Sequence, residues 1–133
     1  MTGPHFFLDR SLGRHRVPNL LREDGWSVVT LAEHYGVPAD ETVDDVNWLE
    51  MAGNNHWPAL MKDEKIRYRP AERAAVVAHD VHAFYLTSGN LTSQQMADHF
   101  ILHRADIWRL ATQPGPALFA VSSGGVRQID LAD

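Results

Sequence analysis

The hydrophobic residues of this chain fall into short apolar runs separated by segments in which apolar positions recur every three or four residues. Short, continuous apolar runs are typical of strands buried on both faces. Segments with the helical period are typical of helices that cover a sheet. The predicted strands are His5–Leu8, Trp26–Leu31, Ala59–Met61, Ala83–Leu86, Leu118–Val121 and Val126–Leu131.

Start and stop signals predict helices between these strands. Pro18 opens a short helix that Gly25 ends, because proline suits a first helical turn and glycine the position after the last. The segment Ala32–Glu41 has no hydrophobic period, which predicts a loop. Three more helices are expected. Thr42 caps the first, which has Val46, Leu49 and Gly53 on one face, and Pro70 opens the second, which has Ala74, Val77, Ala78 and Val81 on its inner face. Thr92 caps the third in a capping box with Gln95, and Pro114 ends it; its inner face holds Met96, Phe100, His103, Ile107 and Leu110.

Strands and helices therefore alternate through most of the chain. This alternation predicts an α/β fold with a mainly parallel sheet, helices on both of its faces and a C-terminal hairpin around Ser122–Gly125. A length of 133 residues fits a single domain spanning 1–133. No apolar run approaches the roughly 20 residues that cross a bilayer, and Asp9 interrupts any signal-peptide pattern, so we expect a cytoplasmic protein without a membrane segment.

The composition narrows the chemistry. The chain has no cysteine, which excludes disulfides, thiol nucleophiles and thiolate zinc sites. A net charge of −5 argues against nucleic-acid binding, because such binding depends on Lys and Arg that neutralise phosphates. Two clusters of basic residues favour nucleic-acid binding instead, and both flank the carboxylates considered next. They are Arg10, Arg14 and Arg16, and Lys62, Lys65, Arg67 and Arg69.

Two aspartates follow predicted strands directly. Asp9 ends the first strand and Asp63 follows the third, and sites in open α/β sheets form beyond the carboxyl ends of the strands. Asp45 lies in the first turn of a predicted helix and could point over the same edge. Three converging carboxylates repel one another unless a cation binds between them, and oxygen ligands favour Mg²⁺ or Mn²⁺. Such a site activates water to attack a phosphodiester.

Each aspartate also has a purely structural interpretation. Asp9 could accept backbone hydrogen bonds in a turn, Asp45 could pair with Thr42 in a capping box, and Asp63 could start the next turn. If the helix started one residue away, Asp44 would take the place of Asp45 at the edge.

Three segments in order, Phe6–Gly13, Asp45–Leu49 and Leu60–Ile66, resemble the motif blocks of the PIN-like domain family of VapC-type toxin ribonucleases. The resemblance extends from about His5 to Leu131. It implies a three-layer PIN-like fold, RNA cleavage that depends on Mg²⁺ or Mn²⁺, and a cognate antitoxin protein that inhibits the enzyme. The resemblance leaves open whether the protein forms a homodimer. By matching position, Asp9, Asp45 and Asp63 are the metal-binding acids.

The chain departs from the family at a further acidic position. Many PIN domains carry another acid near the third block or after the fourth strand, where this chain has Lys65 and Ser88-Gly89-Asn90. The fourth ligand is therefore unassigned, and Ser88 or Asn90 could hold a water instead. The alternative is a catalytically inactive PIN-like module that binds RNA or protein. A phosphoacceptor receiver domain fits less well, because Asp9 stands alone where receivers need an acidic pair.

Other polar residues have competing interpretations. His99 and His103 have the spacing of a helical zinc motif, yet no glutamate follows His99, and His103 fits a core histidine bonded to a carbonyl. Arg10 could bind the scissile phosphate or form a salt bridge to a neighbouring acid. Lys65 and Arg67 fit a rim that contacts substrate phosphates, or simply a solvated charged turn.

Overall fold

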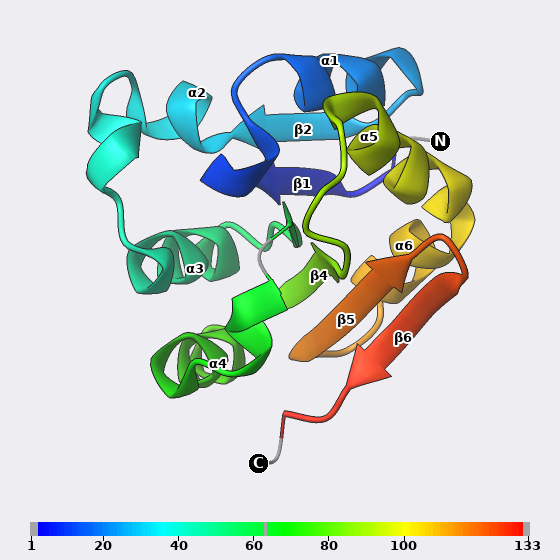
Figure 1. Cartoon of the computed structure of the whole chain (residues 1–133). Helices are drawn as coiled ribbons and strands as arrows, with labels where there is room; N and C mark the ends of the chain where they lie inside the picture. Colours follow the sequence, from blue (N-terminus) through cyan, green and yellow to red (C-terminus); the bar gives the residue numbers. More distant parts are fainter. Residues whose placement is uncertain (1–2, 63, 132–133) are drawn as a thin grey trace.

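The computed structural model describes residues 3–62 and 64–131, with only the backbone of Glu64 and Lys65. Its centre is a sheet with strand order β2-β1-β3-β4-β5-β6, in which β6 alone runs antiparallel to its neighbour (Figure 1). The mainly parallel sheet and the C-terminal hairpin confirm the predicted fold class. The strands are β1 (His5–Leu8), β2 (Ser27–Thr30), β3 (Ala59–Met61), β4 (His82–Leu86), β5 (Ala117–Ser122) and β6 (Gly125–Ile129).

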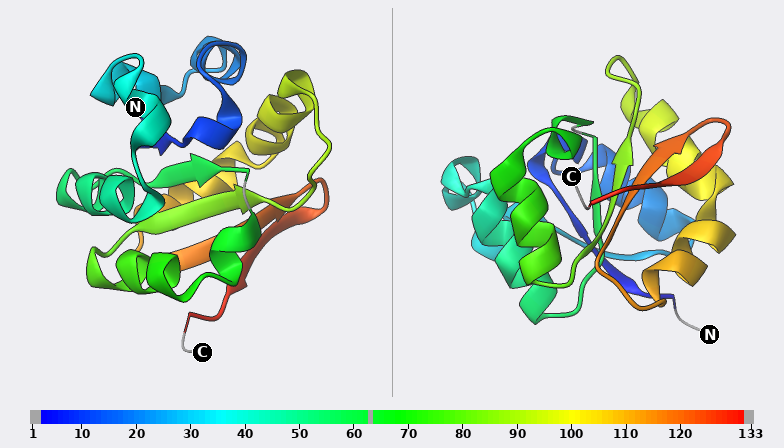
Figure 2. Two further views of the ribbon diagram at one scale, coloured as in Figure 1. Left: turned by 60° about the vertical axis from the view of Figure 1, so that its left-hand side comes forward. Right: turned by 90° about the horizontal axis from the view of Figure 1, so that it is seen from below.

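Helices cover both faces of this sheet, which gives three layers (Figure 2). Alternation along β1 separates two cores, because Phe6 and Leu8 face one side and Phe7 the other. The first core packs under α1, α5 and α6, and the second under α2, α3 and α4. The helices are α1 (Arg16–Glu23), α2 (Leu31–Tyr35), α3 (Asp45–Asn54), α4 (Pro70–Ala78), α5 (Ser93–Leu102) and α6 (Arg104–Ala111), with short 3₁₀ turns η1 (Arg10–Leu12), η2 (Ala39–Thr42) and η3 (Glu64–Arg67).

The prediction of a loop over Ala32–Glu41 is wrong. The chain forms α2 directly after β2, and a 3₁₀ turn follows. Thr30 accepts a hydrogen bond from the Glu33 backbone N–H, and the Glu33 carboxylate accepts one from the Thr30 N–H. This capping box stabilises a helix too short to show a hydrophobic period.

The start of α3 also differs from the prediction. Asp44, not Thr42, is the N-cap, and its side chain makes no capping hydrogen bond. The Thr42 hydroxyl instead donates to the Ala39 carbonyl within η2. The pairing of Thr42 with Asp45 in a capping box is therefore wrong, and Asp45 is the first helical residue.

The predicted inner faces of α3 and α4 are rotated from the observed ones. Val46 of α3 and Val77 of α4 are exposed, by 38% and 48%. The two helices pack against each other as well as on the sheet, so the buried arc lies between the two contacts and not along the most apolar stripe. The residues that these helices bury are Trp48, Leu49, Ala52, Ala75 and Val76.

The single helix predicted after Thr92 is interrupted at His103. Its capping box is present as predicted, with Thr92 and Gln95 bonded reciprocally. At the break between α5 and α6, His103 Nε2 lies 2.8 Å from the carbonyl oxygen of Ser122 on β5. The predicted bond of His103 to a carbonyl is thus confirmed, although the side chain is only half-buried, and α6 turns to place Ile107 in the core. Within residues 3–62 and 64–131, no helix is long and apolar enough to cross a membrane.

Candidate active site

The candidate site lies where the chain order along the sheet changes direction. From β1 the chain proceeds to β2 on one side, and it then returns to β3 on the other side of β1. Leu8 pairs with Leu60 in parallel register, so Asp9 and Lys62 leave the same edge of the sheet. Crevices at such switch points are the usual ligand sites of open α/β sheets.

Asp9 is buried at this edge, with 6% of its surface exposed. Its backbone N–H donates to the Leu60 carbonyl, 3.1 Å away, which continues the pairing of β1 with β3. Its side chain caps η1: Oδ1 accepts from the Ser11 N–H at 3.3 Å, and Oδ2 accepts from the Ser11 hydroxyl at 2.9 Å. The structural role considered for Asp9 is therefore present beside any chemical one.

Ser11 connects the two strand ends. While its hydroxyl donates to Asp9, its Oγ accepts the backbone N–H of Lys62 at 2.9 Å. One side chain thus fixes Asp9 relative to the residue that precedes Asp63. The sequence did not single out Ser11, although a serine two residues after an aspartate is a common turn signal.

We expect Ser11→Ala to lower the free energy of unfolding by about 2 kcal/mol, because the Lys62 N–H and one Asp9 oxygen lose their partner in a partly buried place. Urea denaturation followed by circular dichroism measures this loss. Ser123→Ala, in the exposed turn between β5 and β6, is the control and should change stability by less than about 0.5 kcal/mol. Equal midpoints for the two variants would contradict the connecting role.

Burial dominates the electrostatics of Asp9. Burial first, and the nearby charge of Asp45 second, raise the pKa of the Asp9 carboxyl to about 6. Ser11 and Arg10 oppose the shift without cancelling it. Asp9 and Asp45 are therefore close enough to repel each other, and a cation bound between them would relieve both costs.

Asp45 lies at the N-terminus of α3, where the helix dipole favours a carboxylate. Its Oδ1 accepts from the Trp48 indole N–H at 2.8 Å, and its Oδ2 lies 3.8 Å from an Arg69 guanidinium nitrogen. The structure brings Asp45 toward Asp9, whereas the neighbouring Asp44 shows no such interaction with Asp9.

Glu72 is a second acid beside Asp45 that sequence reasoning missed. A side-chain hydrogen bond joins it to Asp45, and Arg69 lies 3.3 Å from its Oε1. Burial and the Asp45 carboxylate raise the pKa of Glu72 to about 7, although Arg69 lowers it. The signal available in the sequence was the position of Glu72 in the first turn after Pro70, which by itself indicates only a helix start.

An open groove of about 410 Å³ lies over Asp45 and Glu72. Arg10, at its edge, donates to the carbonyls of Asp40 and Val43 at 2.6 and 2.9 Å, and it forms no salt bridge with an acid among the described residues. The residues that line the groove are Arg10, Val43, Asp44, Asp45, Val46, Arg69 and Glu72.

The structure gives fewer contacts for the other residues predicted to form the site. Asp63 lies outside the described residues, as does the side chain of Lys65. The Arg67 guanidinium stacks on the Tyr68 ring, 5.4 Å from its centre. Ser88 and Asn90 are in the bend after β4. Over the part of the chain that the structure describes, no three His, Asp or Glu side chains stand close enough to hold a metal ion.

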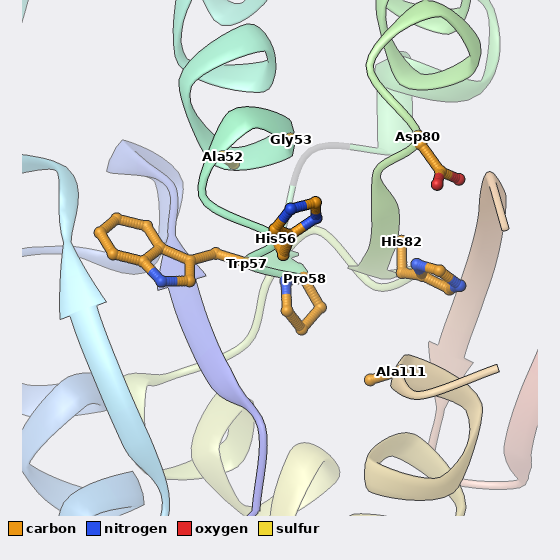
Figure 3. A pocket seen from close by; sticks show the side chains of 8 residues that line it. All are labelled: Ala52, Gly53, His56, Trp57, Pro58, Asp80, His82 and Ala111. Atoms are coloured by element: carbon orange, nitrogen blue, oxygen red, sulfur yellow. The ribbon is translucent and has the colours of Figure 1, made fainter. Parts of the chain in front are cut away.

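A smaller hollow of about 120 Å³ lies at the opposite edge, where β3 and β4 begin. Figure 3 shows that the side chains of Trp57 and His82 point away from each other across it. The buried Nε2 of His82 has no hydrogen-bond partner among the described residues, and the ring packs closely on Gly115. This hollow is remote from the strand ends that carry Asp9 and Lys62, so it belongs to a different part of the molecule.

Comparison with known proteins agrees with this geometry. Residues 4–88 match the family described as PIN like domain. The chain is 36% identical over 117 residues to "Putative ribonuclease VapC45" of Mycobacterium tuberculosis, and the match covers 88% of this chain and 85% of that protein. The chain therefore belongs to the PIN-like domain family and is of the VapC type, as the three sequence blocks predicted. No solved structure matches it significantly.

Proposed function

We propose that this protein is an endoribonuclease that depends on Mg²⁺ or Mn²⁺ and acts as the toxin of a toxin–antitoxin pair. The observation that carries the proposal is Asp9, a buried carboxylate at the switch point of the sheet that is held by Ser11 and repelled by Asp45. The similarity to a protein named as a ribonuclease supports the substrate class.

The donor chemistry of the site fits such an ion. The groups at the edge are carboxylates, which hard divalent cations prefer, and the elevated pKa of Asp9 marks a negative charge that the protein alone does not neutralise. Asp9, Asp45 and Asp63 would hold the ion, with Asp63 following Lys62 directly at the end of β3. When bound, the ion supplies an activated water and neutralises charge on the phosphate.

The protein's own residues then have separable roles. Ser11 keeps Asp9 oriented, and the Trp48 indole holds one oxygen of Asp45. Arg69 lies between Asp45 and Glu72 and limits the repulsion between them. Arg10 at the groove, with Lys65 and Arg67 on η3, would contact phosphates of the RNA backbone.

The test uses purified protein and a labelled single-stranded RNA. Cleavage should require Mg²⁺ or Mn²⁺, stop with EDTA and return when the metal is restored. Cleavage that ignores EDTA would remove the metal mechanism. RNA binding without turnover would instead favour an inactive PIN-like module. A small DNA-binding protein encoded next to this one, able to inhibit the cleavage, would support the antitoxin pairing.

Asp44 and Asp45 offer a matched pair of variants at the same helix start. We expect Asp45→Asn to lower the cleavage rate by roughly 10- to 100-fold, as loss of a metal-site carboxylate or its support usually does. Asp44→Asn should leave the rate within about threefold, because its side chain makes no capping hydrogen bond and, unlike Asp45, is not among the charges that shift the pKa of Asp9. Initial rates at saturating Mg²⁺ decide between them, and a larger loss for Asp44→Asn would reverse the assignment.

A further inference from the structure

Tyr68 is the most exposed large hydrophobic side chain in the described part of the chain, with 67% of its surface accessible. It lies between η3 and α4, in a segment that runs Arg67-Tyr68-Arg69. An exposed aromatic ring between two arginines is not explained by packing, because the ring contributes to neither core cluster. This combination is typical of surfaces that bind single-stranded nucleic acid.

The neighbours of Tyr68 hold it in place. The Arg67 guanidinium lies over the Tyr68 ring at 5.4 Å, in the range of a cation–π contact. A side-chain hydrogen bond joins Arg67 to the hydroxyl of Tyr85, a buried residue at the end of β4. The Tyr68 ring therefore packs on the Arg67 guanidinium, which is itself bonded to the sheet. Because the ring is already held in place, it loses less conformational entropy when it binds a ligand.

Tyr68 also lies close to the carboxylates. The next residue, Arg69, reaches both Asp45 and Glu72, at 3.8 and 3.3 Å. The segment from Glu64 to Arg69 begins directly after Asp63 and ends at this contact. Tyr68 therefore precedes a residue that lines the groove over Asp45 and Glu72, so a strand of RNA in this groove would lie near the Tyr68 ring.

We propose that Tyr68, supported by Arg67, stacks on an unpaired base of the RNA next to the cleaved phosphate. The inference rests on the proposed function and extends it, since it adds a base-stacking subsite beside the proposed metal site. A base in a duplex is already stacked on its neighbours, so only an unpaired base can take this position.

The experiment compares RNA affinity of the full-length wild type with Tyr68→Ala, Tyr68→Phe and Leu102→Ala, by fluorescence anisotropy in EDTA so that no cleavage occurs. We expect Tyr68→Ala to bind about tenfold more weakly, as loss of one base–aromatic stack usually does, and Tyr68→Phe to bind like the wild type. Leu102, 66% exposed on α5, is the matched control for loss of an exposed apolar side chain and should have no effect.

An abasic substitution moved along the oligonucleotide locates the stacked base. At one position the wild type should lose affinity and become equal to Tyr68→Ala, whereas the variant should be insensitive there. Equal affinity of Tyr68→Ala and wild type for the intact RNA would overturn the inference, as would a defect seen only with an antitoxin protein. Failure of the wild type to cleave RNA with Mg²⁺ or Mn²⁺ would overturn the proposed function separately.

Discussion

Asp9→Asn should abolish RNA cleavage and stabilise the metal-free protein. Replacing this carboxylate removes a proposed ligand, and a loss on the order of 10³-fold in rate corresponds to about 4 kcal/mol of transition-state stabilisation from the metal site. The same change removes a buried charge. Folding raises the pKa of Asp9 from 3.8 to about 6, so the ionised group costs about 3 kcal/mol above pH 6.

The size of the stabilisation follows from what asparagine retains. Its amide oxygen accepts only one of the two Ser11 hydrogen bonds, which returns about 1 kcal/mol of the gain. We therefore expect the free energy of unfolding in EDTA to rise by about 1–2 kcal/mol at pH 8. The effect should largely disappear by pH 4, because Asp9 is then protonated in the folded wild type and its buried charge is gone.

Urea denaturation at both pH values, with cleavage measured on the same preparations, checks these opposed effects. Asp106→Asn is the control, because Asp106 is an exposed carboxylate on α6, far along the chain from the site. A loss of both activity and stability in Asp9→Asn would indicate that Asp9 is structural only. Retained cleavage would remove Asp9 from the proposed metal site.

The sheet could be predicted because the sequence of each strand has a clear local pattern. β1 and β3 are apolar on both faces, and each ends abruptly in polar residues, so their bounds were predicted without error. Parallel pairing then brings the residues after them to one edge, which is why Asp9 could be predicted from position alone. The family resemblance added Asp45, which no strand end marks.

The other parts depend on packing that a single sequence does not contain. The buried arcs of α3 and α4 are set by contact between the two helices, and Val77 faces solvent although the helical period placed it inward. Glu72 approaches Asp45 only because these helices lie side by side. Ser11 contacts Lys62, which is 51 positions further along the chain, and no local sequence pattern indicates this contact.

Metal affinity should fall steeply as the pH is lowered from 7 to 5. A divalent cation binds the ionised carboxylates, so it must displace the proton that Asp9 retains below its pKa of about 6. This exchange alone weakens binding about tenfold between pH 7 and 5. The Asp45–Glu72 pair, in which the pKa of Glu72 is raised to about 7, adds a second proton to displace and brings the expected change to the order of 100-fold.

The stability of the protein should show the same linkage to pH without metal, and bound metal should remove most of it. Without metal, the folded state holds protons on Asp9 and Glu72 that the unfolded chain releases, so the free energy of unfolding falls as the pH rises from about 4 to 7. With saturating Mn²⁺ the folded carboxylates stay ionised, so the free energy of unfolding should rise only from about pH 4 to 5, where the unfolded chain still binds protons, and then stay nearly constant up to pH 7.

Isothermal titration calorimetry with Mn²⁺, repeated in buffers of different ionisation enthalpy, measures both the affinity and the protons released per ion. Asp9→Asn separates the contributions of the two groups: any binding it retains should lose the part of the pH dependence that Asp9 supplies and keep the part due to Asp45 and Glu72. An affinity that is independent of pH between 5 and 7 would mean that the cation binds away from these buried carboxylates, and the electrostatic strain at the end of β1 would then serve another ligand.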